Sequence, residues 1–259
     1  MSDSKEIIDK MKKLSGKRLI WGLIGLLLIA GIIWGASWAT YARPPLPEAE
    51  AALVSDQNVE VLQEPWLTFV PLENATQTGF IFYPGGRIDP KGYAALMKPI
   101  AEAGYLVVVP EMPINMAIFD ANAADEIIAL HPEIEHWVIG GHSVGGTAAA
   151  MYTAQHPEKI AGLAIWASYP ADSSDLSALD MPVISMYGSL EERVTDESVG
   201  ARKHLLPADT QYIKIKGGDH HQFGSYVIKP EEHLATLPRA EQHAQIIAAM
   251  LDLLSSVSQ

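Results

Sequence analysis

The stretch that decides the fold spans residues 137–147 and reads W-V-I-G-G-H-S-V-G-G-T. Its apolar start, residues 137–140, leads into Ser143, which lies between two pairs of glycines. A tight turn needs one glycine, whereas four beside one serine indicate a backbone that bends sharply to present that side chain. Residues 148–156 then predict a helix. The order is strand, turn, helix, and Ser143 is the candidate nucleophile.

Short apolar runs alternate with helical segments along most of the chain. Half-exposed strands are predicted at 59–62 and 66–70, and further strands at 79–83, 105–110, 137–140, 163–167, 183–187 and 211–215. Helices are predicted after Asp89, at about 117–130, after Ser143 and at 238–256. This alternation predicts a mostly parallel sheet with helices on both faces. In such folds, ligands bind at the carboxyl ends of the strands.

Candidate partners of Ser143 follow two later strands. The run 183–187 precedes G-S-L-E-E, which contains Glu191, and the run 211–215 precedes K-G-G-D-H-H, which contains His220. The chain order is therefore serine, acid, histidine. Asp172 or Asp175, after the strand at 163–167, could supply the acid instead, but the chain order favours Glu191. His142, beside the serine, is expected to pack beneath it.

These motifs resemble the α/β-hydrolase superfamily, and in particular a small bacterial branch with an N-terminal membrane span and no cap domain. The matching stretches are Y-P-G-G-R-I-D-P-K-G-Y (83–93), E-M-P-I-N-M-A (111–117), W-V-I-G-G-H-S-V-G-G (137–146), W-A-S-Y-P (166–170), G-G-D-H-H-Q-F-G-S-Y (217–226) and A-T-L-P-R-A-E-Q (235–242). The resemblance covers nearly all of residues 60–259. It implies the α/β-hydrolase fold for a domain over residues 59–259.

The resemblance also implies a serine hydrolase that cleaves an ester or a related acyl bond. In it Ser143 attacks the carbonyl carbon, His220 transfers the proton, and Glu191 orients the imidazole. The G-G-x-H pattern of the branch favours His220 over His221. No cofactor is implied, and no metal is expected, because adjacent histidines point apart and no ligand cluster lies beside them.

The same resemblance implies an oxyanion hole, which binds the negative charge that develops on the carbonyl oxygen. The amide of Val144 is one expected donor, and the amide of Gly86 or Arg87, in the loop after the strand at 79–83, is the other. The side chain of Arg87 could meet an anionic group of the substrate or form a surface ion pair.

Two other functions would use the same domain. Acyl transfer to an alcohol needs the same three residues, and a catalytically silent domain would serve as an exported binding or scaffold module. A silent domain has no need of a strained serine turn, which favours the enzyme. Only fifteen residues separate the strands at 163–167 and 183–187, so no lid domain fits there and the site should be open.

The N-terminal part predicts a membrane anchor. Residues 19–42 contain no charge and as a helix reach roughly 36 Å, enough to cross a hydrocarbon core of about 30 Å. This run is longer than the apolar core of a cleaved signal peptide. Six lysines and arginines precede it and only Arg43 follows closely, so residues 1–18 are expected in the cytoplasm and the domain outside it. Prolines in R-P-P-L-P (43–47) predict an extended stalk over residues 43–58.

Composition narrows the partners. The net charge of −13 repels phosphate backbones, so nucleic acid is not expected, and the expected partners are a small ester substrate and a lipid bilayer through residues 19–42. The chain has no cysteine, which excludes a thiol nucleophile and disulfides. The sequence leaves open the substrate, the oligomeric state and whether the exported face is periplasm or cell exterior.

Overall fold

The structure is a computed structural model that describes residues 21–38 and 40–258. The chain forms two compact units, Met1–Tyr41 and Ala42–Gln259. In the first, the helix Trp21–Trp38 is long and apolar enough to cross a membrane, with a mean hydropathy of 1.8. Large side chains on it are exposed, among them Leu27 and Trp34. The predicted cytoplasmic segment 1–18 and residues 19, 20 and 39 of the predicted span lie outside the described residues, and residues 41 and 42 are not helical.

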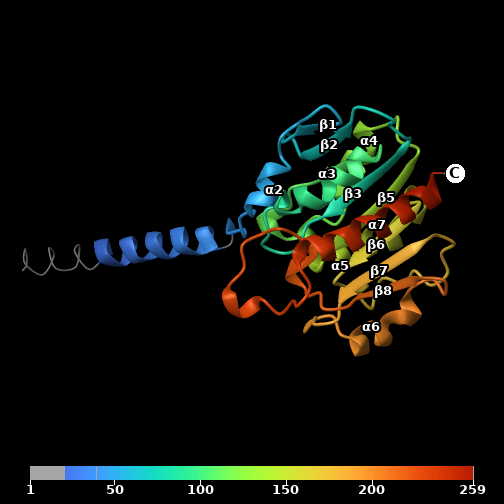
Figure 1. The fold of residues 1–259 in the computed structure, drawn as a ribbon. Helices are drawn as coiled ribbons and strands as arrows, with labels where there is room; N and C mark the ends of the chain where they lie inside the picture. The colour runs from blue at the N-terminus through green and yellow to red at the C-terminus, as the bar shows by residue number, and fades with distance from the viewer. Residues whose placement is uncertain (1–20, 39, 259) are drawn as a thin grey trace, which may run out of the picture. The chain divides into compact units, whose positions relative to one another are not determined.

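The second unit is built on one sheet of eight strands in the order β1-β2-β4-β3-β5-β6-β7-β8 (Figure 1). The strands are β1 Val59–Leu62, β2 Leu67–Pro71, β3 Thr78–Tyr83, β4 Leu106–Val109, β5 His136–His142, β6 Gly162–Trp166, β7 Val183–Gly188 and β8 Gln211–Ile215. The strand β2 is antiparallel to both of its neighbours, β1 and β4, and every other neighbouring pair is parallel. This confirms the predicted mostly parallel sheet.

Helices cover both faces of the sheet, as predicted. They are α2 Pro47–Ala51, α3 Ala94–Glu102, α4 Ala123–Leu130, α5 Val144–Gln155, α6 Asp196–Arg202 and α7 Arg239–Val257. Side chains alternate between faces along a strand, and β3 shows this directly. Phe80 and Phe82 pack in the core beneath α3 and α7, whereas Ile81 and Tyr83 pack in a second core beneath α4 and α5. Figure 1 shows α3 and α7 lying across the sheet on one side.

The helices begin where local chemistry allows. Asp89 accepts a hydrogen bond from the amide of Lys91 (2.9 Å), and Pro90 opens a 3₁₀ turn, Pro90–Tyr93, that leads into α3. Asp89 therefore caps the turn that opens the helical segment predicted after it. The helix predicted over 117–130 begins only at Ala123. The backbone of Met116 and of Asp120 is not helical, so two short 3₁₀ turns, Pro113–Asn115 and Ala117–Phe119, precede α4 instead.

The segment predicted as a stalk, residues 43–58, is part of the second unit rather than a spacer before it. The amide of Arg43 donates to the carbonyl of Arg87 (2.7 Å), and that of Leu46 donates to Ser225 (2.9 Å). The prolines do keep this stretch extended, but an extended backbone offers its hydrogen-bonding groups to neighbours, and here it pairs with two loops. The helix α2 follows, with Ala49 fully buried. Residues 43–58 therefore lie in the compact unit Ala42–Gln259 together with the sheet.

Candidate active site

The turn between β5 and α5 holds Ser143 in a strained conformation. Its φ of 54° and ψ of −126° lie in a region that residues other than glycine rarely adopt. The flanking glycines have no room for a side chain. A Cβ on Gly141 would collide with the backbone of Gly145, and a Cβ on Gly145 would collide with the carbonyl oxygen of Tyr83. The packing therefore explains why the motif has glycine two residues before and two residues after the serine.

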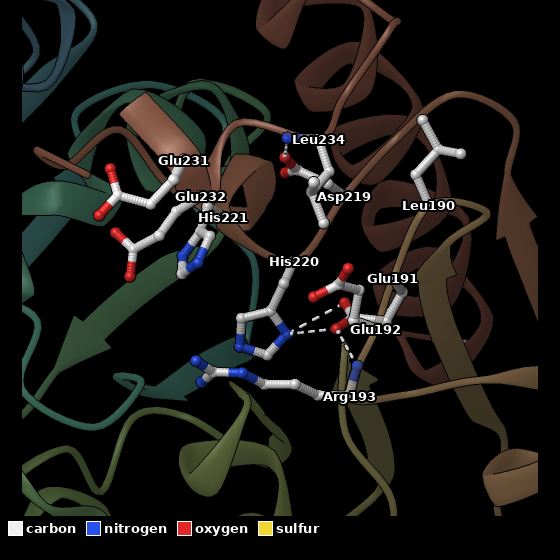
Figure 2. Close-up of a pocket in the computed structure, with 10 residues that line it drawn as sticks. All are labelled: Leu190, Glu191, Glu192, Arg193, Asp219, His220, His221, Glu231, Glu232 and Leu234. Carbon is white, nitrogen blue, oxygen red and sulfur yellow. Dashed lines mark hydrogen bonds and ion pairs between the residues drawn. The ribbon is translucent and has the colours of Figure 1, made fainter. Parts of the chain in front are cut away.

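His220 and Glu191 form a buried pair at the ends of β8 and β7. Nδ1 of His220 lies 3.0 Å from a carboxylate oxygen of Glu191, and the two side chains are 9% and 1% exposed (Figure 2). The carboxylate also accepts a hydrogen bond from the amide of Arg193 (3.2 Å). Because Nδ1 faces the carboxylate, Nε2 is the ring nitrogen left for proton transfer.

One cavity of about 280 Å³ brings the candidate nucleophile and the candidate base together. Ser143 and His220 both line it, and Glu191 reaches it through its hydrogen bond to the histidine. The cavity is also lined by Val144, Thr147, Ala167, Ser168, Tyr169, Arg193 and Val194. The three predicted residues from three separate strand ends therefore converge on one place.

The alternative acids and the second histidine are engaged elsewhere. Asp172 has a side chain that is 85% exposed and pairs with Arg202 at 3.5 Å. Asp175 accepts hydrogen bonds from the hydroxyl and amide of Ser177, which hold the pKa of Asp175 below its ordinary value. The ring of His221 stands at 85° to that of His220, and its Nδ1 lies 3.2 Å from the hydroxyl of Tyr226.

The backbone amides of Gly86 and Arg87, the two expected donors in the oxyanion loop, differ in their hydrogen bonding. The amide of Arg87 donates to the carbonyl of Asn115 at 2.7 Å, so in this structure it already has an acceptor within the chain, which favours Gly86 of the two. The amide of Gly86 has no acceptor within the described residues. A Cβ on Gly86 would lie 3.2 Å from the side chain of Val144, so this loop packs against the start of α5. First-turn amides such as that of Val144 have no partner inside their own helix.

Residues 79–244 match the model of the alpha/beta hydrolase family, and this range contains Ser143, Glu191 and His220. The chain belongs to the alpha/beta hydrolase family. A similar solved structure is MGS-MChE2, an alpha/beta hydrolase enzyme from the metagenome of sediments from the lagoon of Mar Chica, Morocco. It is 19% identical, with a TM-score of 0.55 over 74% of this chain and 98% of that chain, which shows the shared fold. No curated protein matches the sequence.

Membership of the alpha/beta hydrolase family confirms the resemblance drawn from the motifs and supports a hydrolase-type function. Beyond these motifs, a buried tyrosine that the sequence did not single out joins two parts of the site. The hydroxyl of Tyr93 accepts a hydrogen bond from the amide of Gly85 (2.9 Å) and lies 2.9 Å from Nδ1 of His142. Burial, followed by the charges of His220 and His221, lowers the pKa of His142 well below its ordinary value. This favours the neutral form of His142, in which one ring nitrogen can accept a hydrogen bond.

Asp219, directly before His220 in this alpha/beta hydrolase, holds the loop that follows. It is 1% exposed and accepts three hydrogen bonds, from the amides of Gln222 (2.9 Å), Leu234 (3.1 Å) and Ala235 (3.0 Å). Figure 2 shows its carboxylate turned away from His220 and beside Leu234. Asp219 is part of the G-G-D-H-H stretch, but the partners of its carboxylate lie up to sixteen residues away in the sequence. Its role in holding the loop is therefore visible only in the structure.

Proposed function

We propose that this protein is a membrane-anchored serine hydrolase that cleaves an ester or a related acyl bond. One observation carries the proposal: Ser143, on a strained turn, shares a cavity with His220, whose Nδ1 lies 3.0 Å from the carboxylate of Glu191. A nucleophile, a base and a group that orients the base are the parts that acyl transfer needs. The hydrolase-type function of the family agrees with this assignment.

The proposed reaction has two halves. Oγ of Ser143 attacks the carbonyl carbon while Nε2 of His220 takes the serine proton, and Glu191 stabilises the imidazolium that forms. The developing oxyanion accepts hydrogen bonds from the amides of Val144 and Gly86. The ester bond breaks, and His220 returns the proton to the departing alcohol. Water then attacks the acyl-enzyme with the same base, which releases the acid and restores the serine.

The anchor is the second part of the proposal. The helix Trp21–Trp38 supports it by length and apolar character, and the cluster of positive charges before residue 19 favours an N-terminus in the cytoplasm. The catalytic domain would then lie outside the cytoplasm on a single-pass anchor. The acidic net charge of −13 argues against nucleic acid as a partner.

The test of the chemistry uses the full-length protein in detergent micelles. Hydrolysis of p-nitrophenyl butyrate and labelling by a fluorophosphonate probe would be measured for the parent and for Ser143→Ala, His220→Ala, His221→Ala and Glu191→Gln. Loss of about 10³-fold or more in Ser143→Ala and His220→Ala, with activity kept in His221→Ala, is the expected result. A parent that neither hydrolyses esters nor reacts with the probe would point to the silent binding domain instead.

The test of the anchor is independent of activity. Membranes carrying the protein with a C-terminal tag would be washed with alkaline carbonate and then treated with protease in intact and permeabilised cells. The expected protein stays in the membrane at its full length, and its tag is exposed only on the outer side of the cytoplasmic membrane. Release by carbonate, or a shortened chain, would contradict an uncleaved anchor.

A further inference from the structure

Arg193 borders the candidate site at a fixed position. It lies two residues after Glu191, and its amide donates to the Glu191 carboxylate at 3.2 Å. The stretch that supplies the acid of the triad therefore also places the arginine. Its side chain lines the cavity that holds Ser143 and His220, and Figure 2 shows it running past the ring of His220.

The guanidinium group of Arg193 takes part in no ion pair or hydrogen bond within the described part of the chain. Other arginines in this domain do pair with carboxylates, in the ion pairs Arg43–Glu232, Arg202–Asp172 and Arg239–Glu48. The chain offers 31 acidic residues against 18 basic ones, so a shortage of carboxylates does not explain the difference. Its charge reaches the interior of the site: burial lowers the pKa of His142 most, and the positive charge of Arg193 lowers it further.

The surroundings of Arg193 favour an anion on the side of Ser143. No carboxylate is among the residues that line the cavity with Ser143; its other walls are apolar or hydroxylic, from Val144, Tyr169, Val194 and Thr147 among others. The neighbouring cavity, which Arg193 also lines, contains Glu192 and Glu231, whose charges repel an anion. The oxyanion of the reaction has amide donors of its own, so the guanidinium remains available for a different group.

We infer that the site selects esters that carry a second, negatively charged group, a carboxylate or a phosphate, and that Arg193 binds this group. The inference rests on the proposed function. A guanidinium forms two parallel hydrogen bonds with either anion, which gives direction as well as charge. The cavity of about 280 Å³ is small for a ligand site, so the acyl part of the substrate should be short. Arg193 is then a specificity residue that holds the substrate but does not react.

The experiment compares matched esters with the full-length protein in detergent micelles. The anionic substrate is the p-nitrophenyl ester of glutaric acid with its second carboxylate free, and the neutral substrate is the same compound as its methyl ester. A third compound with a phosphonate in place of the free carboxylate distinguishes the two anions. Parent, Arg193→Gln and Arg193→Lys would be compared with Lys214→Gln, which removes one positive charge from an exposed site paired with Asp196.

The parent is expected to prefer the anionic ester over the neutral one by about tenfold or more in kcat/KM. Arg193→Gln should remove the preference through KM, because the anionic ester loses more than the neutral one. Arg193→Lys should keep part of the preference, because a point charge remains, and Lys214→Gln should keep all of it. The preference should also shrink between about 50 and 500 mM salt, since Arg193 is exposed to solvent.

Two results would overturn the inference in different ways. If the neutral ester is hydrolysed and Arg193→Gln leaves the ratio of the two esters unchanged, Arg193 does not bind the anion, while the proposed function stands. If none of the esters is hydrolysed and the fluorophosphonate probe does not react, the proposed function fails and the inference fails with it.

Discussion

The hydroxyl group of Tyr93 joins the turn that carries Ser143 to the loop that carries Gly86. It lies 2.9 Å from Nδ1 of His142, the residue before Ser143, and accepts a hydrogen bond from the amide of Gly85, the residue before Gly86. Tyr93 and His142 are fully buried. One hydroxyl therefore links the two elements that, in the proposed reaction, act on the same carbonyl group.

Tyr93→Phe removes this link without changing the packing of the ring. We expect kcat to fall about tenfold with little change in KM, because the oxyanion donor loses its fixed position while the substrate cavity stays intact. The variant also leaves two buried polar groups without a partner, at a cost of about 1 to 3 kcal/mol of folding stability. Steady-state kinetics and thermal unfolding would measure both effects.

Tyr83→Phe is the matched control. Tyr83 is also buried, and its hydroxyl also bridges two groups, the carbonyl of Ala121 and the amide of Ala124. It should cost similar stability but leave kcat within about twofold. An equal loss of kcat in both variants would mean that Tyr93 acts only through general stability.

Glu191→Asp tests the acid. The aspartate side chain is one methylene shorter, so its carboxylate cannot hold the 3.0 Å contact to His220 without movement of the backbone. We expect kcat to fall about 10- to 100-fold, and Glu191→Gln to fall further, because the histidine then loses the charge that stabilises its protonated form. Asp172→Asn and Asp175→Asn should stay within about twofold of the parent in the same ester assay. Loss of activity in Asp172→Asn with a fully active Glu191→Gln would reverse the assignment.

Gly145→Ala tests the tight packing of the turn. The added methyl group would meet the carbonyl oxygens of Tyr83 and Pro84, which belong to the backbone and cannot rotate away. We expect a loss of about 3 kcal/mol or more of folding free energy, together with loss of activity. Gly200→Ala in α6 is the control, since nothing lies within 4 Å of its new methyl group, and it should raise stability by about 0.5 to 1 kcal/mol. Denaturant unfolding would measure both variants.

Because of the buried His243, we expect the free energy of unfolding to fall in mild acid. Burial, with a smaller contribution from the charge of Arg239, lowers its pKa from the ordinary 6.5 to about 4, while Glu48 acts in the opposite direction. Between these two values the unfolded chain binds a proton that the folded chain does not, so stability falls as the pH falls. The expected loss from this residue is about 2 kcal/mol between pH 7 and pH 5.

The measurement is denaturant unfolding of the parent and of His243→Gln at pH 7 and pH 5. Both proteins share the other buried histidines. The difference between them in how much the free energy of unfolding falls from pH 7 to pH 5 therefore isolates the contribution of His243. An identical fall in parent and variant would show that the pKa of this histidine is the same in the folded and the unfolded chain.

Local sequence was sufficient to predict the sheet and the order of the site residues. The central strands β3 to β7 are continuous apolar runs because both faces are covered, and the glycines around Ser143 follow from the collisions described above. Strand ends of a parallel sheet meet at one edge, so the order of Ser143, Glu191 and His220 implied their proximity. The roles of these three residues remain predictions.

Contacts between distant segments were not predictable in this way. The carbonyl of Asn115 accepts a hydrogen bond from the amide of Arg87, and residues 43–46 pair with loops near residues 88 and 226. The local sequence of these segments does not indicate which segment each one contacts. The late start of α4 has the same origin, because the backbone of residues 113–120 turns repeatedly near the site instead of following helix propensity. The positions of Tyr93 and Arg193 beside the candidate site likewise depend on residues that are distant in the sequence and that the fold brings close to them.

The three backbone hydrogen bonds of Asp219 have a consequence for local opening. Because one carboxylate fastens both ends of the loop over residues 219–235, this loop should open as a single cooperative unit, and its opening would release His220 from Glu191. Hydrogen exchange at the amides of Leu234 and Ala235 would then report how often the histidine leaves its place. These two amides, which do not line the cavity with Ser143, would thus measure the fraction of molecules in which the three site residues are assembled.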